Sequence, residues 1–389
     1  PLLTAQMLRP PTGGSAQDLE WVFCNPADPI NILFSSGTTG VPKAIPWNHT
    51  TAVKCASDGF FHHDIHKGDV VAWPTNLGWM MGPWLIFASF INKASIALYY
   101  GPPTGREFGE FVQNAKVNML GVVPSIVKQW RSSNCLDGLD WSAVKCYSST
   151  GESSNANDMF WLMARAGYKP VIEYCGGTEI GGGYLSGTLV QRASPSYFTT
   201  PAMGLDIVIL DEDGKHANRG EVFIIPPSIG LSTELLNQDH HEVYYSGTPE
   251  LKQGDGPKIL RRHGDEIEAA PSGFFRAHGR VDDTMNLGGI KVSSIEIERV
   301  LNQEEGVIET AAVAVNESGG GPDALVIYAV LNDGTAADTG ELTKKFQQLI
   351  KSRLNPLFKI KEVVGIAELP RTASNKIMRR VLRKQYCSR

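Results

Sequence analysis

A short segment rich in hydroxyl groups and glycine is the clearest chemical signal in the sequence. It follows an apolar run at residues 31–34 that predicts a buried strand. Glycines let backbone N–H groups turn toward an anion, hydroxyls donate further hydrogen bonds, and a lysine adds positive charge. The pattern therefore predicts a polyphosphate-binding loop rather than a solvated turn. The segment comprises Ser35, Ser36, Gly37, Thr38, Thr39, Gly40, Val41, Pro42 and Lys43.

Two positions exclude the Walker loop of the P-loop NTPases. That loop needs a second glycine and a serine or threonine at fixed offsets from its first glycine. Counted from Gly37, these offsets fall on Pro42 and Ala44. Proline has no N–H to offer a phosphate and alanine cannot ligate Mg²⁺, so another polyphosphate-binding fold is required.

Other residues could do chemistry, but each also has a structural explanation. Lys376 could be a solvated cation in a basic tail, and Glu179 could be a carboxylate that interacts favourably with the dipole at a helix N-terminus. Asp265 could belong to a charged turn. The run at 62–66 contains three histidines and an aspartate, which are metal-ligand types. Because no matching ligand cluster occurs elsewhere, we predict a solvated loop there.

The elements that must position these groups alternate along the first half of the chain. Short apolar runs with β-branched residues predict strands, and helix-like segments separate them. This alternation predicts an α/β fold with a largely parallel sheet. The expected strands are 70–73, 95–99, 118–123 and 144–148, and the expected helices are 50–60, 106–116, 125–132 and 155–166.

The later part of the chain changes character twice. Strand-like segments at 206–210 and 221–225, separated by a turn, predict a small β-rich subdomain. Ser293 and Glu296 have the spacing of a capping box. Further strands at 308–315 and 325–331, and then a helix that stops before a proline, predict a compact α+β unit over 283–389.

Composition excludes several classes of protein. The chain has 389 residues, of which 42% are apolar and 20% charged, which is an ordinary globular composition. Its net charge of −5 argues against a nucleic-acid scaffold. The longest apolar run, 84–91, is too short to span a membrane. Six cysteines without a C-x-x-C pair predict free thiols in a reducing compartment. No signal peptide or initial Met opens the sequence, so we expect a fragment or a processed product.

Taken together, the motifs resemble those of the adenylate-forming superfamily, which includes acyl-CoA synthetases, luciferases and the adenylation domains of peptide synthetases. The resemblance covers essentially the whole chain and is closest to the acetyl-CoA synthetase branch, especially plant peroxisomal acyl-activating enzymes. The matching motifs are the loop at 35–43, Gly151-Glu152-Ser153, Glu173-Tyr174-Cys175-Gly176-Gly177-Thr178-Glu179, Gly264-Asp265, Gly279-Arg280-Val281-Asp282-Asp283 and the segment 370–380 around Lys376.

The resemblance implies a role for each matched residue. Thr178 would contact phosphate, Glu179 would bind Mg²⁺, and Asp265 would accept the ribose hydroxyls. Lys376 would be catalytic, bridging the acyl oxygen and the α-phosphate. The implied ATP- and AMP-binding set is Ser35, Ser36, Gly37, Thr38, Thr39, Gly40, Lys43, Gly151, Glu152, Ser153, Glu173, Tyr174, Cys175, Gly176, Gly177, Thr178, Asp265, Arg280 and Lys291.

The resemblance also implies two domains joined by a hinge. An AMP-binding domain, lacking its first portion, would occupy 1–281, and a mobile catalytic-lysine domain would occupy 283–389. Rotation about Asp282 would bring Gly288 and Gly289 to the pantetheine of coenzyme A. Lys351 would supply a cation for the coenzyme A phosphates.

The implied activity is an ATP-dependent acid–CoA ligase that acts through an acyl-adenylate, with ATP, Mg²⁺ and coenzyme A as cofactors or co-substrates. Trp79 would border the acyl pocket, and Gly176 replaces a pocket-closing Trp of the acetate-specific branch, which predicts a medium-chain, branched or aryl-alkyl acid. Two alternatives are a nucleotide-binding fragment without catalysis and an adenylation domain that serves another acceptor. The tail Cys387-Ser388-Arg389 is one Leu short of Ser-Arg-Leu, so a peroxisomal or cytoplasmic location is expected.

Overall fold

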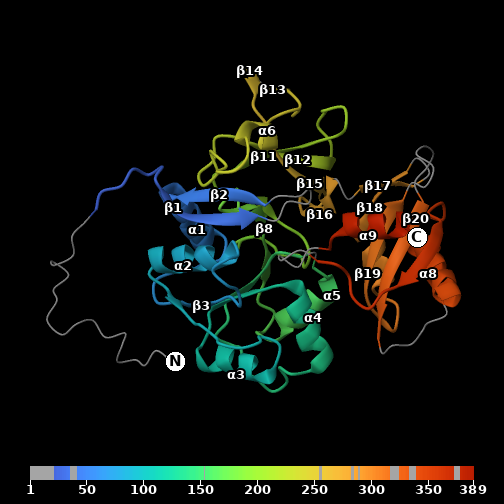
Figure 1. The fold of residues 1–389 in the computed structure, drawn as a ribbon. Coiled ribbons are helices and arrows are strands. Elements are labelled where there is room, and N and C mark those ends of the chain that lie inside the picture. Colours follow the sequence, from blue (N-terminus) through green and yellow to red (C-terminus); the bar gives the residue numbers. More distant parts are fainter. Residues whose placement is uncertain are drawn as a thin grey trace.

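A five-stranded parallel sheet forms the centre of the first half of the molecule (Figure 1). The computed structural model describes residues 22–35, 42–152, 154–253, 256–281, 284–287, 290–315, 324–332, 339–371 and 377–389. The strand order is β4-β3-β5-β6-β7, and every neighbouring pair is parallel. The strands are β3 (Val70–Ala72), β4 (Ser95–Ile96), β5 (Met119–Val122), β6 (Cys146–Ser149) and β7 (Val171–Glu173).

Helices cover both faces of this sheet, as is usual for parallel sheets. Successive strand residues point to opposite faces, so neighbours in one strand pack against different helices. Met119 and Cys146 belong to a core shared with α1 and α2, whereas their neighbours Leu120 and Tyr147 belong to a core shared with α3, α4 and α5. The helices are α1 (His49–Phe61), α2 (Met81–Ile91), α3 (Arg106–Asn114), α4 (Pro124–Ser133) and α5 (Ala156–Ala164). Sequence analysis had assigned no element to α2, whose apolar residues pack in the core.

Antiparallel strands surround the candidate site. β1 (Pro29–Ser35) pairs with β2 (Lys43–Asn48), and β8 (Cys175–Gly177), β9 (Gly182–Ser186) and β10 (Thr200–Pro201) form a small sheet. The β-rich subdomain has the order β11-β12-β15-β16. Its strands are β11 (Asp206–Leu210), β12 (Arg219–Ile225), β15 (Arg261–Ala269) and β16 (Phe275–Arg280), and α6 (His240–Tyr244), β13 (Leu251–Gln253) and β14 (Gly256–Lys258) lie beside it.

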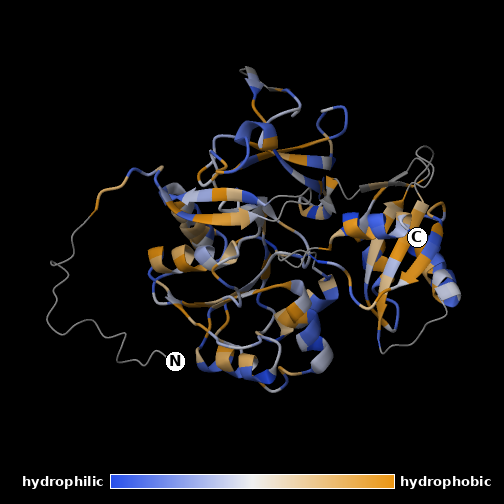
Figure 2. Cartoon of the chain, viewed as in Figure 1, coloured by the Kyte–Doolittle hydropathy of each residue, from blue (hydrophilic) through white to orange (hydrophobic). Residues whose placement is uncertain are grey.

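The C-terminal part is a separate α+β unit with its own core, and its strands β19 and β20 are largely orange in the hydropathy view (Figure 2). Ser293 and Glu296 form the expected capping box at the start of α7. β19 and β20 are antiparallel, whereas β20 and β21 are parallel. The elements are β17 (Thr284–Leu287), β18 (Ile290–Ser293), α7 (Ser294–Leu301), β19 (Val307–Val315), β20 (Ala324–Leu331), α8 (Thr339–Arg353), β21 (Ile360–Gly365) and α9 (Arg379–Cys387).

The architecture confirms the predicted fold class, a large α/β part with a mostly parallel sheet followed by a smaller α+β part. All the strands and helices that sequence analysis expected are present within a few residues of their predicted bounds. Within the described ranges, no helix is both long and apolar enough to cross a membrane. The predicted hinge at Asp282 lies outside the described residues, so the boundary between the two domains stays a prediction.

Candidate functional site

The candidate phosphate loop is anchored by its two flanking strands. Ser35, at the end of β1, is the strand partner of Lys43, at the start of β2. The side chain of Asn237 makes two hydrogen bonds to the second stem. Its Nδ2 donates to the carbonyl of Pro42 at 2.8 Å, and its Oδ1 accepts from the N–H of Ala44 at 2.9 Å. The residues between the stems, Ser36 to Val41, lie outside the described part of the chain.

Thr178 and Glu179 directly follow strand β8, and Thr178 is hydrogen-bonded to β2, the strand that begins with Lys43. The indole Nε1 of Trp47, in β2, donates to the carbonyl oxygen of Thr178 at 2.8 Å. Trp47 is itself fully buried, so this hydrogen bond is shielded from water. The fold therefore fixes Thr178 and the adjacent Glu179 next to the loop stem that carries Lys43.

Glu179 is a buried carboxylate among positive charges. Nδ1 of His263 lies 3.5 Å from its Oε1, and the guanidinium of Arg261 lies 3.4 Å from its backbone oxygen. Lys43 and Arg261 both sit over the ring of Tyr244, at 4.8 and 4.0 Å from its centroid. Burial alone would raise the pKa of Glu179, but the charges of His263, Lys43 and Arg261 hold it at about 2. The carboxylate is therefore ionised at neutral pH.

His263 connects two motifs that are far apart in the sequence. Its Nε2 lies 3.2 Å from Oδ2 of Asp265, while its Nδ1 faces Glu179. The same Asp265 oxygen accepts a 2.8 Å hydrogen bond from the hydroxyl of Tyr184, and the thiol of Cys175 lies 3.7 Å from it. Asp265 is also the strand partner of Arg280, whose side chain lies outside the described atoms.

Sequence analysis missed His263, Tyr184, Arg261 and Asn237 as members of this cluster. A signal existed for two of them, because alternate residues of a strand lie on one face. Arg261 and His263 precede the candidate Asp265 at intervals of two within β15. Gly264, with φ of +85°, adopts a left-handed conformation at this point of the strand.

The candidate adenine turn has a structural task of its own. The carboxylate of Glu152 accepts hydrogen bonds from both the N–H and the hydroxyl of Ser125, at 2.9 and 3.0 Å. It thereby satisfies an N–H in the first turn of α4, where a negative charge is favourable. Gly151, with φ of +90°, provides the left-handed turn that brings this carboxylate to the helix. Ser153 lies outside the described residues.

Glu173 and Tyr174 lie deeper than the other residues of the candidate set. Burial raises the pKa of Glu173 to about 7, although its Oε1 accepts a hydrogen bond from the N–H of Ser196 at 3.1 Å. The hydroxyl of Tyr174 bonds to Asp58, Trp84 and the N–H of Gly183 inside the core. Tyr174 is thus a buried packing residue here, whereas Cys175, beside it, reaches the Asp265 cluster.

The structure gives Gly176 a packing reason of its own. A Cβ built there would lie 1.9 Å from the backbone oxygen of Gly182, because β8 and β9 approach closely at this pair. A larger side chain would therefore have to displace strand β9. The enlarged acyl pocket inferred from Gly176 stays a prediction. Gly177 follows in the same strand, and a Cβ there would meet the carboxylate of Glu179.

The remaining candidates are not gathered at this cluster. Lys376, Asp282, Gly288 and Gly289 lie outside the described residues, as does the side chain of Lys291. Lys351 is exposed in the last turn of α8, and Trp79 is half-buried in the turn that precedes α2.

The prediction of a solvated loop at the histidine run was wrong for its first two members. His62 and His63 are buried at the C-terminal end of α1. Nδ1 of His62 faces the carbonyl of Gly187 at 2.8 Å, and Nε2 of His63 faces the hydroxyl of Ser148 at 2.9 Å. They serve as internal hydrogen-bonding residues. Among the described side chains, no group of three His, Cys, Asp or Glu could hold a metal ion.

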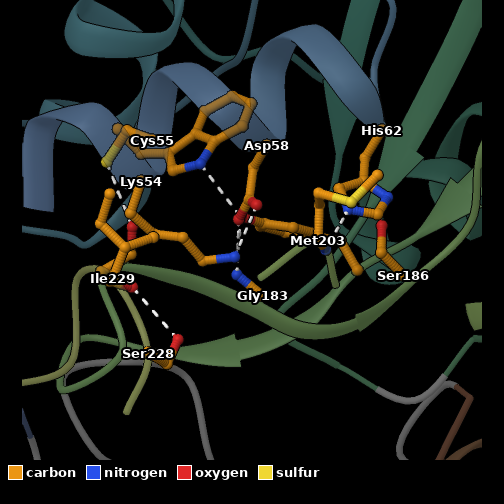
Figure 3. Close-up of polar contacts among 12 residues, drawn as sticks. Lys54, Cys55, Asp58, His62, Gly183, Ser186, Met203, Ser228 and Ile229 are labelled. Carbon is orange, nitrogen blue, oxygen red and sulfur yellow. Dashed lines mark hydrogen bonds and ion pairs between the residues drawn. The ribbon is translucent and has the colours of Figure 1, made fainter. Parts of the chain in front are cut away.

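Beside them lies a second buried network, on α1 (Figure 3). Lys54 Nζ lies 2.6 Å from Oδ1 of Asp58, and both side chains are fully buried. The other Asp58 oxygen accepts from the N–H of Gly183 at 2.9 Å and from the Tyr174 hydroxyl. The sequence shows only a lysine and an aspartate four residues apart, a spacing typical of exposed helix pairs.

Comparison with protein families gives two matches along the chain. The model described as "AMP-binding enzyme" matches residues 7–231, and the model described as "AMP-binding enzyme C-terminal domain" matches residues 296–376. The first covers the candidate loop, the adenine turn and the Glu179 motif. The second ends at Lys376.

Among known proteins, the chain is 55% identical over 364 residues to a hexanoyl-CoA synthase from Cannabis sativa, covering 92% of this chain and 50% of that protein. It is also 55% identical over 363 residues to a probable peroxisomal acyl-activating enzyme 17 from Arabidopsis thaliana, covering 91% of this chain and 50% of that protein. The chain thus spans about half the length of these relatives.

Solved structures show the same fold at lower identity. The acetoacetyl-CoA synthetase from Streptomyces lividans superposes with a TM-score of 0.79 at 23% identity, covering 90% of this chain and 54% of that one. A benzoate CoA ligase from Burkholderia xenovorans superposes with a TM-score of 0.74 at 22% identity, covering 92% of this chain and 69% of that one.

Proposed function

The chain belongs to the AMP-binding enzyme family, and from this premise we propose that it is the nucleotide-activating and catalytic-lysine part of an ATP-dependent acid–CoA ligase. One observation supports the proposal above the others. Through His263, the structure brings Glu179 and Asp265 to one cluster, although they come from motifs 86 residues apart (265 − 179). Lys43, at the stem of the candidate phosphate loop, contributes to the same electrostatic environment.

The chemistry that such a site would serve begins with a poor acyl donor. A carboxylate cannot transfer its acyl group directly, since the leaving group would be oxide. In the first step its oxygen attacks the α-phosphorus of ATP, the bond to pyrophosphate breaks, and an acyl-adenylate forms. In the second step the thiol of coenzyme A attacks the carbonyl carbon, loses its proton, and AMP leaves.

The protein's own contribution to the first step would be positioning and charge stabilisation, because negative charge accumulates on phosphate oxygens. The hydroxyl-rich segment and Lys43 would hold the β- and γ-phosphates. Asp265 would accept the ribose hydroxyls. Lys376 would bridge the acyl oxygen and the α-phosphate.

The residues present fit a magnesium ion. Mg²⁺ is commonly held by one or two carboxylates together with substrate phosphates, rather than by an all-protein cage. Glu179 offers one such carboxylate, and its low pKa keeps it ionised. When bound, the ion would neutralise charge on the phosphates.

The acid is proposed to be of medium length, branched or aryl-alkyl. The hexanoyl-CoA synthase among the relatives is named for a six-carbon acid, which supports the medium-chain class. A peroxisomal location is proposed on the name of the Arabidopsis relative. Transfer to coenzyme A rests on the C-terminal unit rotating about Asp282 to bring Gly288, Gly289 and Lys291 to the site, with Lys351 toward the coenzyme A phosphates.

The test is pyrophosphate release across a panel of carboxylic acids, with and without coenzyme A. We expect release with hexanoate and longer or aryl-alkyl acids, and release that is faster with coenzyme A. Pyrophosphate release that requires the carboxylic acid but has the same rate with and without coenzyme A would favour an adenylation domain that serves another acceptor. Calorimetric binding of ATP without any release would favour a fragment that only binds nucleotide.

Lys376→Ala tests the assignment of the catalytic residue. Loss of one preorganised donor typically costs on the order of 10²–10³ in rate. We expect adenylate formation to fall by this amount, while thioester formation from added acyl-adenylate is spared. Equal loss in both half-reactions would refute the role of Lys376.

A further inference from the structure

Arg261 is a buried cation that contacts no carboxylate directly among the described residues. Its side chain is fully buried at the start of β15. Its Nη2 donates to the hydroxyl of Ser232 at 2.8 Å and lies 3.4 Å from the carbonyl oxygen of Glu179. Its Nε and Nη1 find no hydrogen-bond acceptor in the part of the chain that the structure describes. The partners of this guanidinium are therefore neutral oxygens and the ring of Tyr244.

Such an arrangement is unfavourable in isolation. A buried charge costs several kcal/mol unless an opposite charge and further hydrogen bonds compensate it. Glu179 is the nearest candidate, but His263 and Lys43 also act on that carboxylate. Lys43 and Arg261 therefore share the Glu179 carboxylate, while Asp265 is engaged by His263 and Tyr184. A bound anion near the stem that carries Lys43 would add negative charge beside these two cations.

We propose that Arg261 is a positioning residue for a polyphosphate, and that its buried guanidinium makes the Lys43–Glu179 end of the site select pyrophosphate and ATP over AMP. The inference rests on the proposed function, since it assigns a role within the same site. Arg261 acts through its electric field and through Glu179, which it holds at the backbone oxygen. Its effect therefore falls on the end that carries Lys43.

A purely structural role for Arg261 predicts different behaviour. If the guanidinium only packs against Tyr244 and Ser232, its removal destabilises the fold and weakens all nucleotides alike. If it is an uncompensated charge kept for a ligand, an apolar side chain of similar length leaves the ligand-free protein as stable as before or more stable. The two roles therefore differ in the sign of the stability change and in ligand selectivity.

The experiment measures the binding of magnesium pyrophosphate and of AMP by calorimetry, with thermal unfolding of the ligand-free protein. Arg261→Met should weaken pyrophosphate binding about tenfold to a hundredfold, as expected for loss of a nearby charge at an effective dielectric constant of about 20. AMP affinity and the ligand-free Tm should not fall. Arg261→Lys, which retains the charge, should recover much of the pyrophosphate affinity.

Arg262→Met is the matched control. Arg262 is the next residue in β15, and it pairs with Glu221 at 2.9 Å on the β-rich subdomain. Its replacement should leave both ligands' affinities unchanged.

Three results would overturn the inference. They are an equal loss of AMP and pyrophosphate binding in Arg261→Met, an unchanged pyrophosphate affinity, and failure of that variant to fold. Wild-type protein that binds AMP but not pyrophosphate would also overturn the inference, although the proposed nucleotide site would still be supported. Wild-type protein that binds neither ligand would instead reject the proposed function, and the inference with it.

Discussion

Two buried clusters of charge, one on α1 and one at the start of β15, differ in how completely their charges are matched. On α1, Lys54 and Asp58 meet at 2.6 Å, and Asp58 accepts further hydrogen bonds from Gly183 and Tyr174. At the start of β15, Arg261 meets only neutral acceptors among the described residues. If Arg261 has the proposed role, the completeness of a buried charge's pairing, rather than burial alone, separates a structural residue from a functional one.

The α1 network, called closed here because its charges are paired, packs against the glycine run that lies beyond Glu179 in the sequence. Gly181, Gly182 and Gly183 pass so close to α1 that a Cβ at Gly182 would lie 2.4 Å from Oδ2 of Asp58. These glycines follow Glu179 after one residue, Ile180, and the last two of them begin β9, the partner of β8. The network thereby fixes the strand pair that carries the Thr178–Glu179 motif.

The largest expected effect is on the closed cluster. Asp58→Ala leaves the Lys54 ammonium buried without its partner and removes an acceptor from Gly183 and Tyr174. Breaking a buried pair in this way typically costs about 3–5 kcal/mol of unfolding free energy. Urea unfolding measures the loss.

The double variant Lys54→Met/Asp58→Ala is the control for Asp58→Ala. It should recover part of the lost stability, because no buried cation remains. A loss of less than about 1 kcal/mol in Asp58→Ala, the range of an exposed pair, would contradict the interpretation of a closed network.

The two clusters also show how far the sequence leads. Periodicity located β1 and four strands of the parallel sheet, because these depend on local pattern, whereas no strand was expected at β2, the second stem of the loop segment. The family resemblance, and not periodicity, singled out Asp265. The pairing of Lys54 with Asp58 carries no local sign of burial, since the same spacing is common on helix surfaces. The histidines at 62 and 63 were placed in a solvated loop because no matching metal-ligand cluster occurs elsewhere, and that argument carries no information about burial. Burial depends on Gly183, Tyr174 and Trp84, which come from distant parts of the chain.

The second prediction concerns acid. Burial lowers the pKa of His63 to about 4 from a reference near 6.5, so the folded state favours the neutral ring. The stability that His63 contributes is present above pH 6.5 and is lost as pH falls toward 4, up to about 3 kcal/mol. The pKa of Glu179 is held at about 2, against a reference value of 4.5. The stability that this carboxylate contributes is therefore present above pH 4.5 and is lost as pH falls below that value.

On acidification the protein should therefore lose the stabilising contribution of His63 before that of Glu179. Unfolding free energies measured from pH 7 to pH 4 should fall more steeply in the wild type than in His63→Gln, whose side chain does not titrate. Identical slopes in the two proteins would show that His63 is not the group responsible.

The third prediction concerns the glycine run between the clusters. Gly182→Ala would place a methyl group against Asp58 and Lys54, and overpacking of this kind typically costs about 1–3 kcal/mol. Because the strain acts on β9, the affinity for AMP should fall together with stability. Gly365→Ala is the control, since a Cβ there would meet nothing within 4 Å. Equal stability of the two variants would show that the close approach at Gly182 is unimportant.

The smallest expected effect comes from an ion pair with the same sequence spacing as Lys54 and Asp58. Arg106 and Glu110 lie four residues apart on α3, at 3.0 Å, but their side chains are 50% and 47% exposed. Water solvates both groups when the pair is broken, so Glu110→Ala should cost only about 0.3–0.5 kcal/mol, and less in high salt. Urea unfolding of Glu110→Ala beside Asp58→Ala compares an exposed and a buried pair of one geometry. A loss in Glu110→Ala as large as that in Asp58→Ala would mean that helix spacing, not burial and complete pairing, determines what such a pair contributes.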